Sequence, residues 1–214
     1  MELSALLAEL QPYGARLVAV SKTQPIEAIR GLYEQGQRHF GENRVQDLLE
    51  RKEALPDDIR WHLIGHLQTN KVKYIASFVH CIHSVDSLRL LEEIDRQAQR
   101  CGRVIDVLIQ LKVAREETKY GLSRPEAEDL LRAAPTLKAV RVCGIMGMAS
   151  FVADEAQVAA EFAELHRHFV ALKAAFYPND PAFCELSMGM SGDYPLALRA
   201  GSTLVRVGSL LFGG

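Results

Sequence analysis

Short apolar runs alternate with amphipathic stretches along almost the whole chain. The apolar runs predict strands buried on both faces, because consecutive apolar residues rich in valine and isoleucine are typical of such strands. Eight of these runs occupy residues 16–22, 38–41, 61–65, 79–83, 103–112, 139–145, 182–186 and 203–207. The stretches between them have helical periodicity. We expect helices near residues 4–10, 23–33, 44–54, 70–77, 86–100 and 154–176, with two more starting near 124 and 193.

Strands that alternate with helices, without a long polar linker, predict a single (β/α)8 TIM barrel. An open doubly wound sheet is the alternative architecture. That sheet commonly binds its ligand through a G-x-G-x-x-G turn after the first strand, and no such turn follows residues 16–22. We therefore expect one barrel domain over residues 1–214, near the small end of the size range for this fold.

Composition and charge argue against several classes of function. The net charge is -2 and no basic run is interleaved with aromatic residues, so nucleic acid is not an expected partner. The N-terminus lacks the basic and apolar regions of a secretory signal. No apolar segment approaches the roughly 20 residues needed to span a bilayer. We expect a cytoplasmic protein with no membrane partner.

The cysteines and histidines predict neither a disulfide framework nor a metal site. The four cysteines are widely separated and include no C-x-x-C pair, so we interpret them as reduced thiols. Two histidine pairs are close in sequence, but neither is placed on one face of a helix. These pairs are His62 with His66 and His166 with His168. Because no third ligand is evident, we expect no metal.

Candidate chemistry gathers at the carboxyl ends of the predicted strands, where (β/α)8 barrels build their active sites. Lys22 ends the first strand, where a buried strand gives way to a loop, and this placement suggests an amine held in a pocket. Residues 187–192 follow the seventh strand, and Gly208 and Ser209 follow the eighth. Glycine amides and serine hydroxyls bind anions, and the loops after strands seven and eight are the usual phosphate site of this fold.

An amine beside a phosphate site suits a phosphorylated carbonyl compound. A neutral amine attacks an aldehyde and forms a Schiff base. Pyridoxal 5′-phosphate (PLP) meets both requirements, and so does a sugar phosphate cleaved by a Schiff-base aldolase. Lys119 is a rival amine in another loop at the barrel mouth, although a solvated loop lysine is the simpler interpretation.

Six ordered motifs resemble the PLP homeostasis proteins, the YggS/PROSC-like family. They cover almost the whole chain and comprise VAVSKT (18–23), FGENRVQ (40–46), WHLIGHLQTNK (61–71), SVDS (84–87), LSMGMS (186–191) and GSTLVRVG (201–208). The resemblance implies a PLP-binding barrel of fold type III, like the N-terminal domain of alanine racemase.

The resemblance also implies a set of cofactor-binding residues. Lys22 would form the Schiff base and Arg206 would face the pyridine nitrogen. Asn43 would lie near the ring, at a position where it could also be the N-cap of the next helix. His62 and Met146 could line the faces of the ring. The phosphate would be surrounded by residues of the last two loops, namely Ser187, Gly189, Met190, Ser191, Gly208 and Ser209.

The Arg206 position bears on whether the cofactor does chemistry. A permanent guanidinium charge beside the ring nitrogen discourages its protonation, so the ring is a weaker electron sink. Nothing after residue 212 corresponds to the extra β-domain that supplies a second base in alanine racemases. We expect a non-enzymatic carrier, most simply a monomer, that buffers PLP and delivers it to apo-enzymes. A racemase-like enzyme is the main alternative, and a sugar-phosphate aldolase is the third.

Overall fold

The chain forms a closed barrel of eight parallel strands in its computed structural model, which describes residues 1–114 and 120–213. Consecutive strands are neighbours around the barrel, and β8 pairs with β1 to close it. This order confirms the predicted (β/α)8 barrel. The strands are β1 (Arg16–Val20), β2 (His39–Glu42), β3 (Arg60–Leu63), β4 (Cys81–Val85), β5 (Ile105–Gln110), β6 (Val140–Met146), β7 (Glu185–Met190) and β8 (Leu204–Val207).

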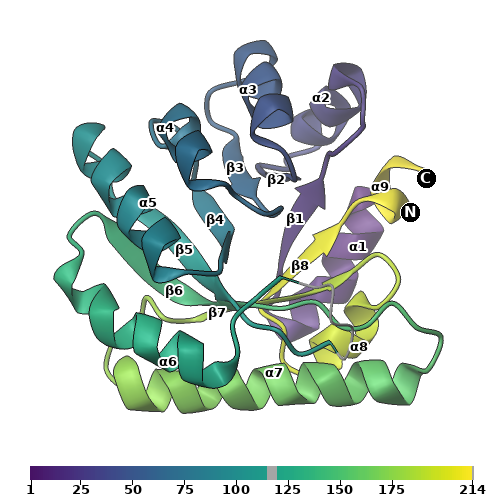
Figure 1. Cartoon of the computed structure of the whole chain (residues 1–214). Helices are drawn as coiled ribbons and strands as arrows, with labels where there is room; N and C mark the ends of the chain where they lie inside the picture. The colour runs from purple at the N-terminus through teal and green to yellow at the C-terminus, as the bar shows by residue number, and fades with distance from the viewer. Residues whose placement is uncertain (115–119, 214) are drawn as a thin grey trace.

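Helices surround the barrel (Figure 1). They are α1 (Leu3–Leu10), α2 (Ile26–Glu34), α3 (Val45–Ala54), α4 (Val72–Ile75), α5 (Leu88–Arg100), α6 (Arg124–Ala133), α7 (Glu155–Phe176), α8 (Tyr194–Arg199) and α9 (Ser209–Phe212). Three 3-10 turns, η1 (Gln11–Tyr13), η2 (Thr69–Lys71) and η3 (Ala134–Thr136), extend helices α1, α4 and α6. Within the described ranges, no helix has both the length and the apolar character needed to cross a bilayer.

Helix α5 illustrates how the sequence pattern produces the barrel's outer layer. Its buried side chains include Leu90, Leu91 and Ile94, which recur at helical spacing and pack against the strands. The helix starts where Ser87 Oγ accepts a hydrogen bond from the backbone N–H of Leu90 at 3.3 Å. Glu92 and Arg96 of the same helix face solvent, whereas Asp95 is buried and accepts hydrogen bonds from the backbone of Lys138 and Ala139. Amphipathic stripes of this kind cover the apolar outer face of the sheet.

Strand β7 is longer than the sequence predicts. We expected a strand over residues 182–186 followed by a loop, whereas β7 continues to Met190. Its pairing with β8 shifts register between Ser187 and Met190, and Gly189 has a φ of +95°. Glycine tolerates this left-handed backbone, so the strand can continue through the irregularity. Part of the predicted phosphate loop is therefore strand.

A second irregularity lies in β6. Gly144 has a φ of +151°, and the pairing of β5 with β6 shifts register between Val107 and Leu108. A Cβ at Gly144 would lie 1.8 Å from the carbonyl oxygen of Glu185. The backbones of β6 and β7 therefore approach each other here as only glycine allows.

Candidate functional site

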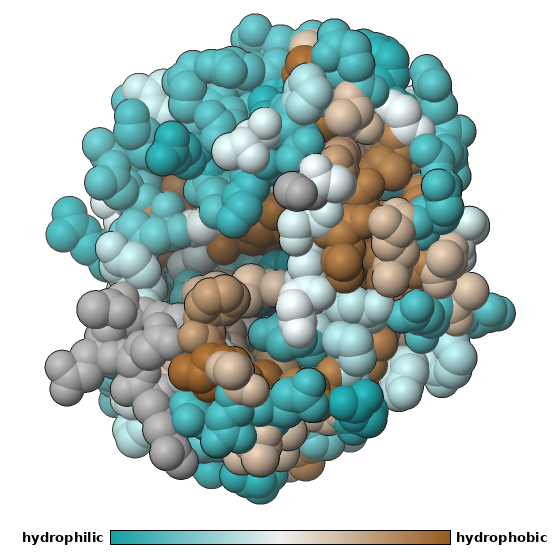
Figure 2. All heavy atoms as spheres, turned by 90° about the vertical axis from the view of Figure 1, so that its right-hand side faces the viewer, coloured by the Kyte–Doolittle hydropathy of each residue, from teal (hydrophilic) through white to brown (hydrophobic). Residues whose placement is uncertain are grey.

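A cavity of about 600 Å³ lies at the carboxyl ends of the strands. Figure 2 shows a molecular face that is hollowed near its centre, with hydrophobic side chains on both sides of the hollow. Apart from His62 and Met146, nine residues were predicted for the site, and seven of them line the cavity: Lys22, Asn43, Met190, Ser191, Arg206, Gly208 and Ser209. The fold thus brings the predicted lysine and both predicted loops together. Their contact with a cofactor stays a prediction.

Lys22 lies in a turn just after β1. Its side chain lines the cavity, as expected for an amine held in a pocket, but the residue is exposed and not recessed. The turn is held by backbone hydrogen bonds from Ser21 N to Gly41 O at 3.0 Å and from Gln24 N to Ser21 O at 3.1 Å. Thr23 has a φ of +65°, which is rare for a β-branched residue and costs on the order of 1–3 kcal/mol. Such strain persists only where the surroundings fix the backbone.

A buried ion pair supports the Lys22 turn. Glu42, at the end of β2, is fully buried, and its Oε1 accepts a hydrogen bond from Ser21 Oγ at 2.6 Å. Arg51 of α3 places Nε 2.6 Å from the same oxygen, although not in hydrogen-bond alignment, and donates from a second nitrogen to Gln24 O at 3.0 Å. Burial raises the pKa of Glu42, while the Ser21 hydroxyl and the Arg51 charge oppose that shift. The pair joins β2 and α3 to the turn.

Arg206 brings a buried charge to the cavity wall. Only 4% of the residue is exposed, and its guanidinium donates to Ser187 Oγ and to Gly147 O, the latter at 3.2 Å. Burial lowers the pKa of Arg206 to about 10, and the charge of Asp193 opposes the shift. The side chain is therefore still protonated at neutral pH. Glu185, near the start of β7, pairs with Arg16 and not with Arg206.

The ends of β7 and β8 meet beside the end of β1. Gly208 N donates to Ser191 Oγ at 3.2 Å, which links the two loops. A Cβ at Gly208 would lie 2.9 Å from Val20 O, so glycine permits the β8 loop to pack against the end of β1. Closure of the barrel thus places the serine hydroxyls of these loops close to the turn that carries Lys22.

Two predicted phosphate contacts lie behind the cavity wall. Ser187 is fully buried, and its hydroxyl accepts a hydrogen bond from Arg206. A Cβ at Gly189 would lie 2.6 Å from the Cβ of Ala197, so this glycine lets α8 approach β7. Neither residue lines the cavity. The geometry supports a role in positioning their neighbours, and it does not support the expected direct contact with a phosphate.

Asn43 lines the cavity but does not cap helix α3. Arg44 is the N-cap residue, and its side chain makes no capping hydrogen bond, so the predicted capping role of Asn43 is wrong. The Asn43 backbone instead packs against the next loop, where a Cβ at Gly65 would lie 2.3 Å from Asn43 O. This contact fixes the two adjoining loops of the cavity wall.

His62 and Met146 do not lie in the cavity wall, so the suggestion that they line the faces of a bound ring is wrong. Met146 is 1% exposed and packs with Cys81 and Leu108 inside the barrel. His62 lines a separate pocket near the amino ends of the strands. The rival amine, Lys119, lies outside the described residues.

Several residues of the cavity wall were not predicted. Gln110 ends β5, and its side-chain amide donates to Tyr120 O at 3.0 Å. The ring of His66 stacks on that of Tyr120 with centroids 4.4 Å apart. Phe151 is 92% exposed at the cavity edge. Gln110 could have been predicted, because it is a polar residue at the end of an apolar run. His66, Tyr120 and Phe151 could not, because only the conformation of their loops brings them together.

A chain of imidazoles crosses the barrel interior toward the cavity. His39 Nδ1 lies 2.8 Å from His62 Nε2, and His62 Nδ1 lies 2.8 Å from His83 Nε2. His83 Nδ1 lies 3.1 Å from Ser187 Oγ, the atom to which Arg206 donates. Burial lowers the pKa of His39 to about 4 and holds those of His62 and His83 well below the usual range. The three rings are therefore neutral at neutral pH.

Comparisons with known proteins agree with this geometry. The family profile described as alanine racemase, N-terminal domain, matches residues 3–214. A PLP homeostasis protein of Aquifex aeolicus (strain VF5) is 42% identical over 200 residues, covering 93% of this chain and 86% of the relative. A PLP homeostasis protein of Synechocystis sp. (strain PCC 6803) is 38% identical over 212 residues, covering 98% of this chain and 95% of the relative.

A solved structure is similar over nearly the full length of both chains. PipY of Synechococcus elongatus PCC7942, determined without PLP, has a TM-score of 0.91 and 39% identity, covering 99% of this chain and 98% of its own. The same protein with PLP bound has a TM-score of 0.88 and 38% identity with the same coverage. The similarity therefore extends to a protein solved both with and without this ligand.

Proposed function

Because the chain belongs to the family of PLP homeostasis proteins, which share the fold of the alanine racemase N-terminal domain, we propose that it binds PLP as a Schiff base on Lys22. The observation that carries this proposal is the convergence of Lys22, Ser191 and Arg206 on one cavity. An amine can bond to an aldehyde carbon, and a hydroxyl can donate a hydrogen bond to a phosphate. A fixed guanidinium can donate a hydrogen bond to a pyridine nitrogen.

The donor set of the cavity fits the chemistry of PLP. Ser191 and Ser209 offer hydroxyl donors to a phosphate, and Gly192 and Gly208 leave the backbone accessible beside them. The exposed Lys22 amine can attack an aldehyde carbon, after which the aldehyde oxygen leaves as water. The cavity volume of about 600 Å³ lies within the usual range for small-molecule sites, roughly 300–1,000 Å³.

Arg206 supports carriage of the cofactor over amino-acid turnover. PLP supplies an electron sink for carbanions when it is bound in an enzyme. A guanidinium only donates hydrogen bonds, so a ring nitrogen facing Arg206 accepts one and carries no proton of its own. Ser187 and Gly147 hold the guanidinium in place, and its buried charge further disfavours a second positive charge nearby.

We also propose that the bound cofactor is exchanged with apo-enzymes, which would make the protein a buffer and a donor. The exposure of Lys22 supports this role, because a solvent-accessible Schiff base is open to attack by water or by another amine. A single-domain monomer in the cytoplasm completes the proposal. The four free cysteines suit a reducing compartment.

The test is the visible absorption spectrum of the purified protein with PLP, before and after borohydride reduction, followed by peptide mapping. We expect an imine band in the wild type and a reduced pyridoxyl adduct on Lys22. Lys22→Ala should lose both, whereas Lys138→Ala, an exposed lysine after α6, should keep them. A band of equal intensity in Lys22→Ala would overturn the proposed linkage.

Turnover is tested separately by deuterium exchange at the α-carbon of added amino acids. A carrier should show exchange no faster than free PLP at the same concentration. Sustained exchange at an enzyme-like rate that depends on Lys22 would contradict the carrier proposal and would favour the racemase-like alternative.

A further inference from the structure

Three imidazoles converge near the amino ends of the strands, away from the cofactor cavity. His39 starts β2, His62 lies in β3, and His80 immediately precedes β4. The ring centroids are 5.1 Å apart for His39 and His62, 5.2 Å for His62 and His80, and 5.5 Å for His39 and His80. One ring nitrogen from each residue lies within 4.8 Å of the others. Neighbouring parallel strands thus present three nitrogen ligands to one point.

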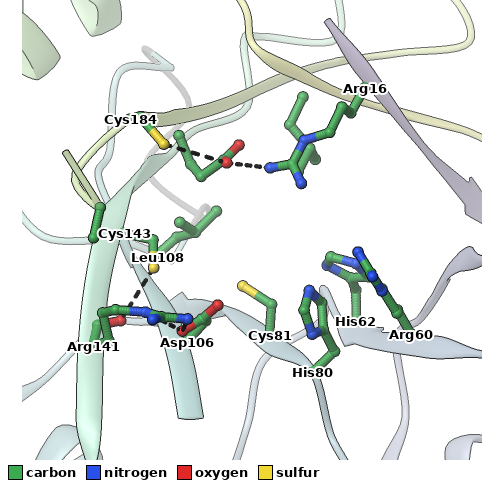
Figure 3. Close-up of a pocket in the computed structure, with 13 residues that line it drawn as sticks. Arg16, Arg60, His62, His80, Cys81, Asp106, Leu108, Arg141, Cys143 and Cys184 are labelled. Atoms are coloured by element: carbon green, nitrogen blue, oxygen red, sulfur yellow. Dashed lines mark hydrogen bonds and ion pairs between the residues drawn. The ribbon is translucent and has the colours of Figure 1, made fainter. Parts of the chain in front are cut away.

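The cluster adjoins a pocket of about 280 Å³ whose wall includes His62 and His80. Figure 3 shows these two rings beside each other at the pocket, with Cys81 on the adjoining backbone. The sulfur of Cys81 also lies within 4.8 Å of ring nitrogens of His62 and His83. The pocket leaves space next to the rings for an ion and an additional ligand.

The spacing of the rings agrees with tetrahedral coordination. Zn²⁺ binds imidazole nitrogen at about 2.0–2.1 Å, which places two ligating nitrogens about 3.3 Å apart and their ring centroids about 5.2 Å apart. The observed centroid separations of 5.1, 5.2 and 5.5 Å are close to that value. His39 Nδ1 and His62 Nε2 are 2.8 Å apart and point toward each other, so the rings must separate by about 0.5 Å and also turn before both nitrogens face one ion.

The other nitrogen of His62 is already held. Its Nδ1 lies 2.8 Å from His83 Nε2, which leaves Nε2 facing His39. Metal-ligating histidines almost always use the second ring nitrogen in a hydrogen bond that fixes the tautomer and the ring orientation. His83 can perform this positioning role without itself touching the ion.

Charges around the cluster limit which ion can bind. Arg16 and Arg60 oppose a cation, although Arg16 is paired with Glu185, and Asp106 in the same pocket is paired with Arg141. Hard cations such as Ca²⁺ and Mg²⁺ require several oxygen ligands, which a trio of imidazoles does not provide. Nitrogen ligands suit Zn²⁺, Cu²⁺, Ni²⁺ and Co²⁺ instead.

We propose that His39, His62 and His80 form a binding site for a transition-metal ion of the Zn²⁺ type, at the end of the barrel opposite the cofactor cavity. The three-strand convergence and the hydrogen-bonded second nitrogen of His62 carry this proposal, and the centroid spacing is compatible with it. It does not depend on PLP binding, since none of the three rings lines the cofactor cavity.

The test is a Zn²⁺ titration of the chelator-treated, dialysed full-length chain by calorimetry, with the bound metal quantified after gel filtration. We expect one Zn²⁺ per chain. His39→Gln and His80→Gln should each weaken binding by at least about tenfold, in line with the loss of a ligand. His168→Gln, on α7 beside Glu164, is the matched control and should bind like the wild type.

Thermal unfolding of the metal-free wild type and of the three variants checks that the variants fold. We expect them to fold, because His39 and His80 are partly exposed. Co²⁺ should give the intense visible bands of tetrahedral coordination in the wild type and in His168→Gln, and weak bands in the other two variants. Failure to retain stoichiometric Zn²⁺, or equal affinity in folded His39→Gln and His80→Gln, would overturn the proposal.

Discussion

At the scale of single residues, the position of Lys22 depends on groups that never reach the cavity. The Glu42–Arg51 pair lies beneath the Lys22 turn, and Ser21 connects the two through its hydroxyl. The strained φ of Thr23 lies within the same turn. The placement of Lys22 is therefore a property of β2 and α3 as much as of β1.

Glu42→Gln keeps the side-chain volume and removes the negative charge, which leaves Arg51 buried without its ionic partner. Breaking a buried pair in this way costs about 3 kcal/mol or more, and we expect that loss in the free energy of unfolding measured with urea. Glu50→Gln, an exposed position on the same helix as Arg51, should change stability by no more than about 0.5 kcal/mol.

The same variant should bind PLP more weakly than the Glu50→Gln control, because the turn that presents Lys22 loses its support. A PLP titration followed by the imine band measures this effect. Wild-type stability and affinity in Glu42→Gln would show that the ion pair does not position the lysine.

Sequence motifs located Lys22, Arg206 and Ser191 because each follows or ends a strand of clear apolar pattern. They did not locate His62 correctly. Side chains alternate along a strand between the barrel interior and the helix layer, but this alternation does not show at which end of the interior an inward-facing side chain lies. The exposure of Lys22 was also unpredictable, since it depends on a turn with an unusual backbone at Thr23.

At the scale of elements, the helices and strands were predictable in order and kind, and their ends were not. Strand β7 extends four residues past its expected end at 186, since Gly189 accommodates the register shift against β8. Period-two patterning does not reveal such shifts, because they depend on how closely two backbones approach. Glycines mark these points, but sequence alone does not distinguish them from glycines in ordinary turns.

Gly144→Ala tests the close approach of β6 and β7. The new Cβ would overlap Glu185 O at 1.8 Å, so we expect a loss of about 3 kcal/mol or more in unfolding free energy, or failure to fold. Gly31→Ala, in the interior of α2 with nothing within 4 Å of the new Cβ, should instead stabilise the protein by up to about 1 kcal/mol.

Urea denaturation, or the yield of folded protein where Gly144→Ala does not accumulate, gives the comparison. If the two alanine variants shifted stability by similar amounts, the irregularity in β6 would not constrain the barrel as described.

At the scale of the whole molecule, barrel closure is what builds the candidate site. Strands β1 and β8 are separated by almost the full sequence, yet their pairing brings the Lys22 turn next to Gly208 and Ser191. The Met1 amine also donates to Leu210 O at 2.7 Å, and Figure 1 shows both marked ends of the chain beside α9. The eight alternating apolar runs predict this closure, but they do not predict which residues of the two strand ends come into contact.

Because the site joins both ends of the barrel sequence, PLP should stabilise the whole fold. At a free concentration 100 times the dissociation constant, a ligand of the native state adds about 2.7 kcal/mol. For a chain of this size, that gain should raise the melting temperature by roughly 5–10 °C. Differential scanning fluorimetry of wild type and Lys22→Ala, each with and without PLP, measures the shift. A shift of equal size in both proteins at equal PLP concentration would argue against Lys22 as the anchor.

The chain of hydrogen-bonded imidazoles links the hydrogen positions at one end of the barrel to those at the other end. Each neutral imidazole has one donor and one acceptor nitrogen, so the hydrogens from His39 through His83 to Ser187 all point in one direction or all in the other. A ligand that takes the lone pair of His62 selects one of these two orders. It thereby decides whether the Ser187 hydroxyl donates to His83 or accepts from it, directly behind Arg206. By thermodynamic reciprocity, a group that sets the Ser187 hydroxyl at one end of this relay would in turn favour or oppose a ligand of His62 at the other end.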